Sequence, residues 1–234
     1  MTTSPPHIGT LREGPLHASL KQWCARPGDR FEVPVDGYVI DLVRDDLLIE
    51  VQTSGFSSMK EKLRDLLEGG HRVRVIHPIP VRKSIVKIDA AGEVLSRRRS
   101  PKRGDSLDIF GELVSIPQLI AHPGFEIKLV LTIEDEYRKH DPSRAWRRRG
   151  WVVMERRLVE IEGTVTIADV AALATFLPDE LPEPFTTSDL ASAVDRPIRL
   201  AQQMAYCLRH CAAIEPIGKR GNAVEYHRIP TLLA

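Results

Sequence analysis

The sequence predicts an α/β fold of the α+β kind, in which a mixed β-sheet flanked by helices is followed by a smaller module of helices and a hairpin. The first 80 or so residues place helical and β-branched segments in the order α-β-β-β-α-β. Two apolar runs there are separated only by Arg44-Asp45-Asp46, a turn-like cluster typical of a β-hairpin. The last 70 or so residues indicate several helices and then a second hairpin.

Length and composition favour two compact units. The chain has 234 residues, of which 42% are hydrophobic and 28% charged, as in ordinary globular proteins. The formal charge of +1 excludes a uniformly basic polyanion binder, so basic clusters at 97–103 and 147–149 carry the charge signal. No apolar stretch approaches the roughly 18 residues of a membrane helix, and no signal peptide is evident, so we expect a cytoplasmic protein. Three cysteines, Cys24, Cys207 and Cys211, form no zinc or disulfide pattern.

The domain boundaries are predicted from changes in composition. Residues 1–10 are polar and proline-bearing, which favours a flexible tail. We expect an α/β domain over 11–145, a β-prone connector over 146–165 and a second domain over 166–234.

Each element of the first domain has a local signal. A helix is predicted over Glu13–Cys24, where Leu16, Leu20 and Trp23 have helical spacing, and a strand over Arg30–Val35. After the hairpin, apolar residues at helical spacing predict a helix that begins near Phe56 and ends at Gly69-Gly70. The remaining predictions are strands at Val73–Ile76, Ser84–Ile88, Glu93–Ser96 and Phe125–Ile133, a helix at Asp105–Ala121, a basic connector at Arg144–Arg149 and a β-prone segment at Trp151–Val165.

The first hairpin contains two acidic residues whose relative position follows from the turn. If Asp45-Asp46 form a two-residue loop, Asp41 lies directly opposite Glu50. Gln52 then shares the face of Glu50, while Leu47, Ile49 and Val51 fill the other face. Like charges opposite one another destabilise a sheet by roughly 0.2–1 kcal/mol. A hard divalent cation is the expected reason for keeping them.

The segment Asp41…Glu50-Val51-Gln52, inside the order α-β-β-β-α-β, resembles the core of the PD-(D/E)XK nuclease superfamily over roughly residues 10–80. The resemblance implies a restriction-endonuclease-like domain in which Asp41, Glu50 and the carbonyl of Val51 bind Mg²⁺ or Mn²⁺. Its third catalytic position, usually lysine, is Gln52 here, as in some restriction enzymes. Glutamine can orient water but has no positive charge.

Three further residues are candidates for this site. Lys60, one turn from Arg64 on the following helix, is the proposed replacement for the missing cation. Glu13 and, less typically, His17 resemble the additional acid that many of these nucleases place on the first helix.

The C-terminal segment resembles a winged helix-turn-helix. Helices are predicted over Ile167–Phe176, after Thr186–Asp189, and over Pro197–Cys211, followed by two strands around a basic glycine turn. In the longest helix Ala201, Met204, Leu208 and Cys211 form one stripe, and Arg199, Gln202, Tyr206 and Arg209 form the opposite one. The expected DNA-binding residues are Arg196, Arg199, Gln202, Gln203, Lys219, Arg220 and Asn222.

These resemblances imply a magnesium-dependent DNA endonuclease, or another DNA-processing nuclease, that hydrolyses phosphodiester bonds. The alternative is a non-catalytic DNA-binding protein or regulator built on a degenerate nuclease fold, which Gln52 keeps open. DNA is the expected partner and RNA a weaker one, because phosphate chemistry alone does not distinguish the sugar. A homodimer is expected for double-strand cleavage.

Overall fold

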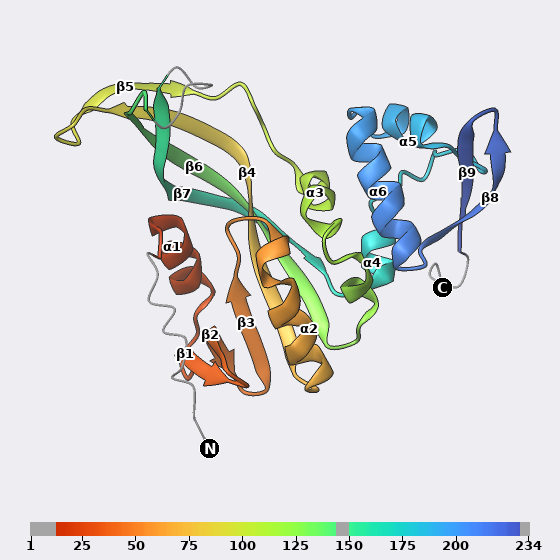
Figure 1. The fold of residues 1–234 in the computed structure, drawn as a ribbon, viewed down its shortest axis with the longest axis horizontal. Helices are drawn as coiled ribbons and strands as arrows, with labels where there is room; N and C mark the ends of the chain where they lie inside the picture. The colour runs from red at the N-terminus through yellow and green to blue at the C-terminus, as the bar shows by residue number, and fades with distance from the viewer. Residues whose placement is uncertain (1–12, 144–149, 230–234) are drawn as a thin grey trace. The chain divides into compact units, whose positions relative to one another are not determined.

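The computed structural model describes residues 13–143 and 150–229, and the chain divides into two compact units. The first unit contains the residues up to Thr53 together with Val75–Asp105 and Leu129–Val165. The second contains Ser54–Arg74, Ser106–Lys128 and the residues from Thr166 onward. Figure 1 shows the elements of both.

The two units interleave along the chain, unlike the predicted boundaries at 145 and 165. Segments 54–74 and 106–128, predicted in the first domain, belong to the unit that holds the C-terminal segment. Residues 151–165, predicted as a connector, lie in a long strand of the sheet. Composition along the chain cannot reveal such interleaving, because it arises from contacts between distant segments. The predicted connector at 144–149 lies outside the described residues.

The sheet confirms the predicted α+β class. Its strand order is β1-β2-β3-β4-β6-β7, with β5 paired to β4. The pairs β1–β2, β2–β3 and β4–β5 are antiparallel, whereas β4 runs in the same direction as β3 (Figure 1), so the sheet is mixed. The strands are β1 (Arg30–Val35), β2 (Tyr38–Arg44), β3 (Leu47–Val51), β4 (Arg72–Ile88), β5 (Val94–Arg99), β6 (Phe125–His140) and β7 (Trp151–Ile167).

β4 is far longer than the predicted strand Val73–Ile76 and contains Pro78 and Pro80. Pairing with the segment after β3 is marked by the bond from the backbone N–H of Gln52 to the carbonyl of Ile76, and pairing with β5 begins only at Ser84. The two prolines therefore lie between the β3 and β5 pairings, where that side of β4 needs no ladder donor. The prolines made the sequence pattern look like two strands.

The first helix, α1 (Pro15–Cys24), packs on the sheet near β3, as Figure 1 shows. Its position follows from Leu16 and Leu20, which are buried one turn apart. They form one core cluster with Leu42, Leu47, Ile49, Val51, Ile76 and Val130. The predicted inward face of β3 is thereby confirmed.

The second unit begins with a 3₁₀ turn, Phe56–Met59, that leads into α2 (Lys60–Glu68). The single helix predicted over Asp105–Ala121 is wrong. The chain forms α3 (Phe110–Leu113) between 3₁₀ helices at Ser106–Ile109 and Pro117–Ala121. Pro117 cannot continue an α-helix, and it starts the last of these turns.

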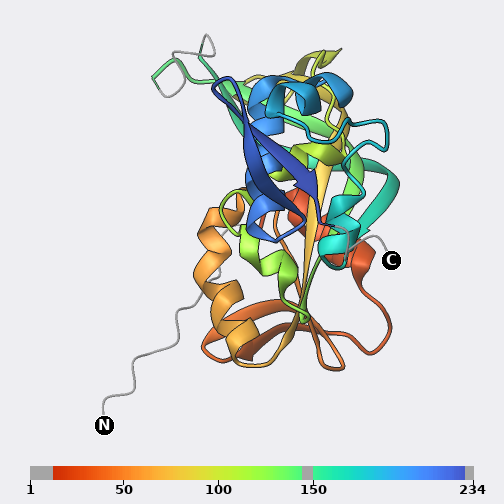
Figure 2. The same ribbon diagram turned by 90° about the vertical axis from the view of Figure 1, so that its right-hand side faces the viewer.

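The C-terminal elements confirm the predicted order of helices followed by a hairpin. They are α4 (Val170–Ala174), α5 (Thr187–Ala193), α6 (Ile198–His210), β8 (Ile214–Arg220) and β9 (Ala223–Arg228). Thr186 and Asp189 form a capping box at the start of α5. Phe185, just before α5, exchanges two backbone hydrogen bonds with Tyr226 of β9, and Figure 2 shows β8 and β9 beside α6.

α6 has the two faces that its spacing predicts. Ala201, Met204, Leu208 and Cys211 are buried, and Arg199, Gln202, Tyr206 and Arg209 are exposed. The buried face packs against α3 and α5, and the thiol of Cys207 lies 3.9 Å from the carbonyl of Phe110. Burial raises the pKa of the Cys207 thiol to about 12, so the thiol is a packing group.

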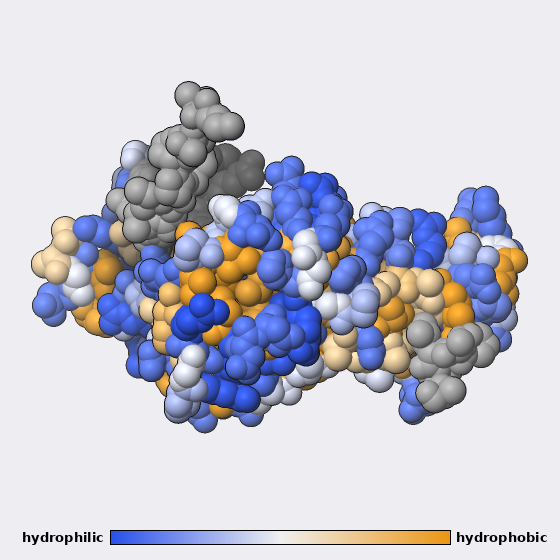
Figure 3. Space-filling view, turned by 90° about the horizontal axis from the view of Figure 1, so that it is seen from below, coloured by the Kyte–Doolittle hydropathy of each residue, from blue (hydrophilic) through white to orange (hydrophobic). Residues whose placement is uncertain are grey.

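The surface seen in Figure 3 is mainly hydrophilic, with apolar residues in separate patches. Within residues 13–143 and 150–229, no helix has the length and apolar character that crossing a membrane requires.

Candidate functional site

The predicted register of the first hairpin is confirmed. Leu42 pairs with Ile49 and Arg44 with Leu47, which leaves Asp45-Asp46 as a two-residue turn. Asp45 has φ 50°, the left-handed conformation that such turns use and that aspartate tolerates. Extended by one step beyond its last pair, Leu42 with Ile49, the same register places Asp41 opposite Glu50.

Each of these carboxylates accepts a hydrogen bond from the opposite strand. The backbone N–H of Val51 donates to Oδ2 of Asp41 at 2.8 Å, and the backbone N–H of Asp41 lies 3.3 Å from Oε1 of Glu50. Glu50 is buried at 8% exposure, and all five residues of β3 are buried. Each acid is therefore bound to the backbone of the other strand.

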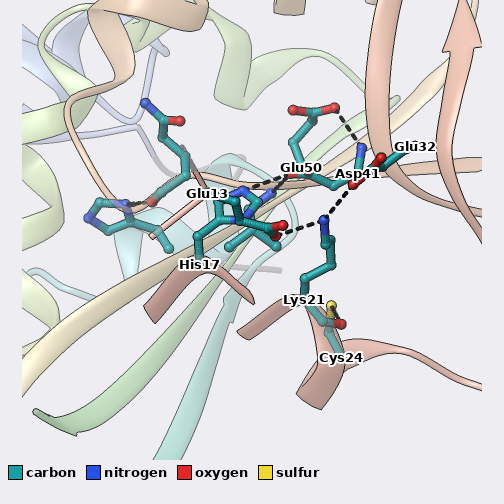
Figure 4. A network of polar contacts seen from close by, with 10 residues as sticks. Glu13, His17, Lys21, Cys24, Glu32, Asp41 and Glu50 are labelled. Carbon is teal, nitrogen blue, oxygen red and sulfur yellow. Dashed lines mark hydrogen bonds and ion pairs between the residues drawn. The ribbon is translucent and has the colours of Figure 1, made fainter. Parts of the chain in front are cut away.

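Helix α1 adds ionisable side chains to this pair (Figure 4). His17 Nε2 lies 3.2 Å from Asp41 Oδ2, and His17 Nδ1 lies 2.7 Å from Glu13 Oε1. Lys21 Nζ lies 2.7 Å from Glu13 Oε1 and 3.2 Å from Glu32 Oε1. These contacts join α1 to the hairpin, and we call the set Glu13, His17, Lys21, Glu32, Asp41 and Glu50 the hairpin site.

The pKa values in the hairpin site follow from this pairing. Burial alone would lower the pKa of His17, but the Asp41 and Glu13 carboxylates outweigh it and raise that pKa above its ordinary value. Burial opposes ionisation of Asp41, yet His17 and the N–H of Val51 hold its pKa below the usual range. Lys21 is likewise kept charged, because its carboxylate partners raise its pKa against the effect of burial. The site is thus strongly ionic near neutral pH.

Two residues of the hairpin site, Lys21 and Glu32, were missed by sequence reasoning. Glu13, His17 and Lys21 recur every four residues, which was the available signal for Lys21. Glu32 lies opposite Asp41, because the flanking pairs are Phe31 with Leu42 and Val33 with Ile40. Its backbone has φ 51°, an unfavourable value for glutamate within a strand, and nothing in the sequence signals it.

The residues that follow β3, Gln52 and Thr53, are held by two side chains, one from β4 and one from β7. His77 Nδ1 lies 2.7 Å from the carbonyl oxygen of Gln52, and the Arg156 guanidinium donates to the carbonyl of Thr53. Burial lowers the pKa of His77 to about 4, so the ring is neutral and Nδ1 carries the proton that it donates. Gln52, predicted as catalytic, therefore has its backbone held on the side of β4.

The role predicted for Lys60, to supply a cation, stays a prediction. Lys60 is an exposed residue at the start of α2, which belongs to the second unit. Lys21 is the lysine that lies among the acids.

The predicted metal ligands offer hard oxygen atoms only. Asp41 and Glu50 supply carboxylates and Val51 a backbone carbonyl, which is the donor type that Mg²⁺ and Mn²⁺ prefer. Among the described residues, no group of three or more His, Cys, Asp or Glu side chains is arranged to hold a metal ion. The acids and histidine of the hairpin site therefore form no such group either, and the donor types of Asp41, Glu50 and Val51 are those of a hard divalent cation.

The predicted DNA-binding residues of the C-terminal segment fall into two groups. Arg199 and Gln202 on α6 are exposed, as are Lys219 and Asn222 on the hairpin, and Gln203 is half-buried. Two arginines are occupied internally. Arg196 pairs with Asp108, and Arg220 lies 3.0 Å from Asp189 and 2.8 Å from Glu225.

Comparison with known proteins places this α+β chain and its acidic hairpin in a family. Residues 14–168 match a family described as a domain of unknown function (DUF8091), and the chain belongs to that family. An uncharacterized protein of Treponema pallidum (strain Nichols) is 30% identical over 224 residues, which is 95% of this chain and 88% of the relative. No solved structure matches the chain.

Proposed function

We propose that the protein is a metal-dependent nuclease that hydrolyses phosphodiester bonds in DNA. The observation that carries the proposal is the placement of Asp41 opposite Glu50, with His17 of α1 in contact with Asp41, inside an α-β-β-β-α-β core. A divalent cation would offset the like charges of two carboxylates on opposite positions of neighbouring strands.

Asp41, Glu50 and the carbonyl of Val51 would hold Mg²⁺ or Mn²⁺. When bound, the cation would lower the pKa of a coordinated water and neutralise charge on the phosphate. His17 keeps a proton on Nε2 beside Asp41 and would give it to the leaving oxygen. Lys21 supplies the positive charge that Gln52 lacks.

A winged-helix module over residues 166–229 would deliver the substrate. This part of the proposal is supported by the helices and hairpin in that order, and by the isolated bridge that pairs Phe185 with Tyr226 at the side of β9. The exposed stripe of α6 would face the DNA. We expect a cytoplasmic protein and a homodimer on duplex DNA, which sedimentation with and without DNA tests.

The deciding experiment is cleavage of supercoiled, linear, branched and single-stranded DNA with Mg²⁺ or Mn²⁺. Asp41→Asn and Glu50→Gln should each abolish cleavage. Asp45→Asn is the matched control, because it removes an acid from the turn of the same hairpin while asparagine tolerates φ 50°. If the wild-type protein binds DNA but cleaves none of these substrates, the proposal that it is a nuclease is refuted.

The second candidate function is a non-catalytic DNA-binding regulator on a degenerate nuclease fold. It is favoured by Gln52, which stands where the superfamily usually has lysine, and by the exposed stripe of α6, which does not depend on the hairpin site. In that case Asp41→Asn and Glu50→Gln leave DNA affinity and biological activity unchanged, whereas charge removal on α6 lowers both.

A further inference from the structure

Strand β5 differs from the other strands of the sheet, because all six of its residues are exposed. It pairs with β4 and with no other strand among the described residues. Figure 1 shows β5 beside the far half of β4. One side of β5 is thus an open edge, which presents backbone N–H groups as well as side chains.

This edge carries a surplus of positive charge. Arg98 and Arg99 lie in β5, and Lys102 and Arg103 follow at once; we call these four residues the β5 strip. None of the four forms an ion pair within residues 13–143 and 150–229, and the rest of the sequence contains no aspartate or glutamate.

Paired cations occur on the same strand as the β5 strip and elsewhere in the sheet. Arg97 lies 2.8 Å from Asp135, and Lys83 lies 2.7 Å from Glu136. Arg157 lies 2.6 Å from Glu155. Unlike these residues, the four cations of the β5 strip have no carboxylate partner within residues 13–143 and 150–229.

The backbone that carries the β5 strip is fixed to β4. The N–H of Ser100 donates to the carbonyl of Lys83 at 2.8 Å, and the N–H of Gly104 donates to the carbonyl of Pro80 at 3.0 Å. Between them, the N–H of Lys102 lies 3.3 Å from the hydroxyl of Ser100. The four cations are therefore held on an ordered backbone, so binding costs less conformational entropy than for a free basic tail.

We propose that the β5 strip binds the phosphodiester backbone of DNA, running along the open edge of β5. The inference rests on the proposed function, in that DNA is the substrate of the hairpin site. Side chains of a strand alternate between faces, so Arg98 and Arg99 would reach a nucleic-acid strand from both sides of the edge. Pairing with a second copy of β5 is disfavoured, because it would oppose arginines with arginines.

The test is the salt dependence of binding to a labelled DNA duplex in EDTA, which separates binding from cleavage. Removing one arginine that binds a phosphate should reduce the slope of log K against log salt by about 0.9. We expect the double variant Arg98→Gln/Arg99→Gln to lower the slope by nearly 2. Arg157→Gln is the control, because this exposed arginine is already paired with Glu155, and it should leave the slope unchanged.

Each outcome decides between defined alternatives. If the double variant keeps the wild-type slope, the β5 strip does not bind the DNA backbone, and the nuclease proposal is unaffected. The lowered slope together with no metal-dependent cleavage by the wild type supports the strip and overturns the nuclease. Failure of the wild-type protein to bind duplex overturns the assignment of the β5 strip, and cleavage of single-stranded or branched DNA with Mg²⁺ then decides the nuclease proposal separately. Competition by poly-glutamate as strong as that by duplex of equal charge would show an acidic-protein surface and overturn the assignment to DNA.

Discussion

The Nε2 atom of His17 lies 3.2 Å from Oδ2 of Asp41, while Nδ1 of the same ring lies 2.7 Å from Oε1 of Glu13. An ionised carboxylate only accepts hydrogen bonds, so both ring nitrogens must donate. This arrangement therefore requires the imidazolium form of His17. The charge of one histidine links the first helix to the acidic hairpin.

The stabilisation by His17 should depend on pH in a defined window. Its pKa is raised, so its contribution is complete below the ordinary histidine pKa near 6.5 and is lost as pH rises through the folded value. The pKa of Asp41 is lowered, so that carboxylate's contribution fades at acidic pH. We expect His17→Gln to reduce the free energy of unfolding by about 1–2 kcal/mol near pH 5.5 and by much less at pH 9.

Urea unfolding of both proteins across this range measures the difference. Proton NMR of the ring checks the cause, since Asp41→Asn should move the pKa of His17 downward. An equal loss of stability at pH 5.5 and pH 9 would contradict the ion pairing.

His77 should give the opposite pH dependence. Burial lowers the pKa of this ring to about 4, whereas the unfolded chain takes up a proton below about pH 6.5. Stability is therefore lost as pH falls through this window, by up to about 3 kcal/mol. In His77→Asn, whose amide can donate to the carbonyl of Gln52, unfolding measured at pH 7 and pH 4.5 should differ less than in the wild type. An unchanged difference would exclude His77 as its source.

The two acids of the hairpin should respond oppositely to neutralisation. Glu50→Gln keeps an acceptor for the N–H of Asp41 and removes a like charge, so we expect a gain of about 0.5–1 kcal/mol in the free energy of unfolding. Asp41→Asn removes the charge partner of His17 and should cost about 1–2 kcal/mol. Thermal unfolding of the two variants measures both changes in stability. A loss of stability in Glu50→Gln would show that the carboxylates do not repel.

The hairpin could be predicted because its determinants are local. Asp45-Asp46 set the turn, the turn sets the register, and the register places Asp41 opposite Glu50. The stripes of α6 were equally local, since helical spacing alone separates Arg199 from Ala201. Such features need no knowledge of the rest of the chain.

The remaining features depend on tertiary contacts. The approach of Lys21 to the acids is set by packing of Leu16 and Leu20 on the sheet, which spacing within the helix does not specify. The length of β4 depends on the strands that pair with it before and after Pro78 along the chain. The interleaving of the two units depends on contacts between distant segments.

Arginines of the C-terminal segment should separate into binding and structural residues. Arg199 and Arg209 are exposed on α6 without ion pairs among the described residues, whereas Arg196 pairs with Asp108. We expect Arg199→Ala and Arg209→Ala each to weaken DNA binding and to reduce the salt slope by about 1, with unchanged stability. Arg196→Ala should lower the melting temperature instead. Fluorescence anisotropy measures the DNA binding of each variant, and thermal unfolding measures its melting temperature. Equal losses of DNA binding in all three variants would refute this division.

At position 32 we expect the glycine variant to be more stable than the glutamine variant. This is the reverse of the usual order within a strand, where glycine is the less stable of the two. Its φ of 51° costs a non-glycine residue roughly 1–2 kcal/mol, and the side chain lies 3.2 Å from Lys21 beside Asp41. Both variants lose this ion pair, but only Glu32→Gly also relieves the backbone, so it should unfold with a free energy about 1 kcal/mol higher than Glu32→Gln. Arg30, exposed in the same strand, is the control at which glycine should be the less stable of the two. The same order at both positions would mean that Glu32 is unstrained; the reverse order at Glu32 alone would show that backbone strain is held next to the acidic pair, as is common where a side chain must be positioned for function.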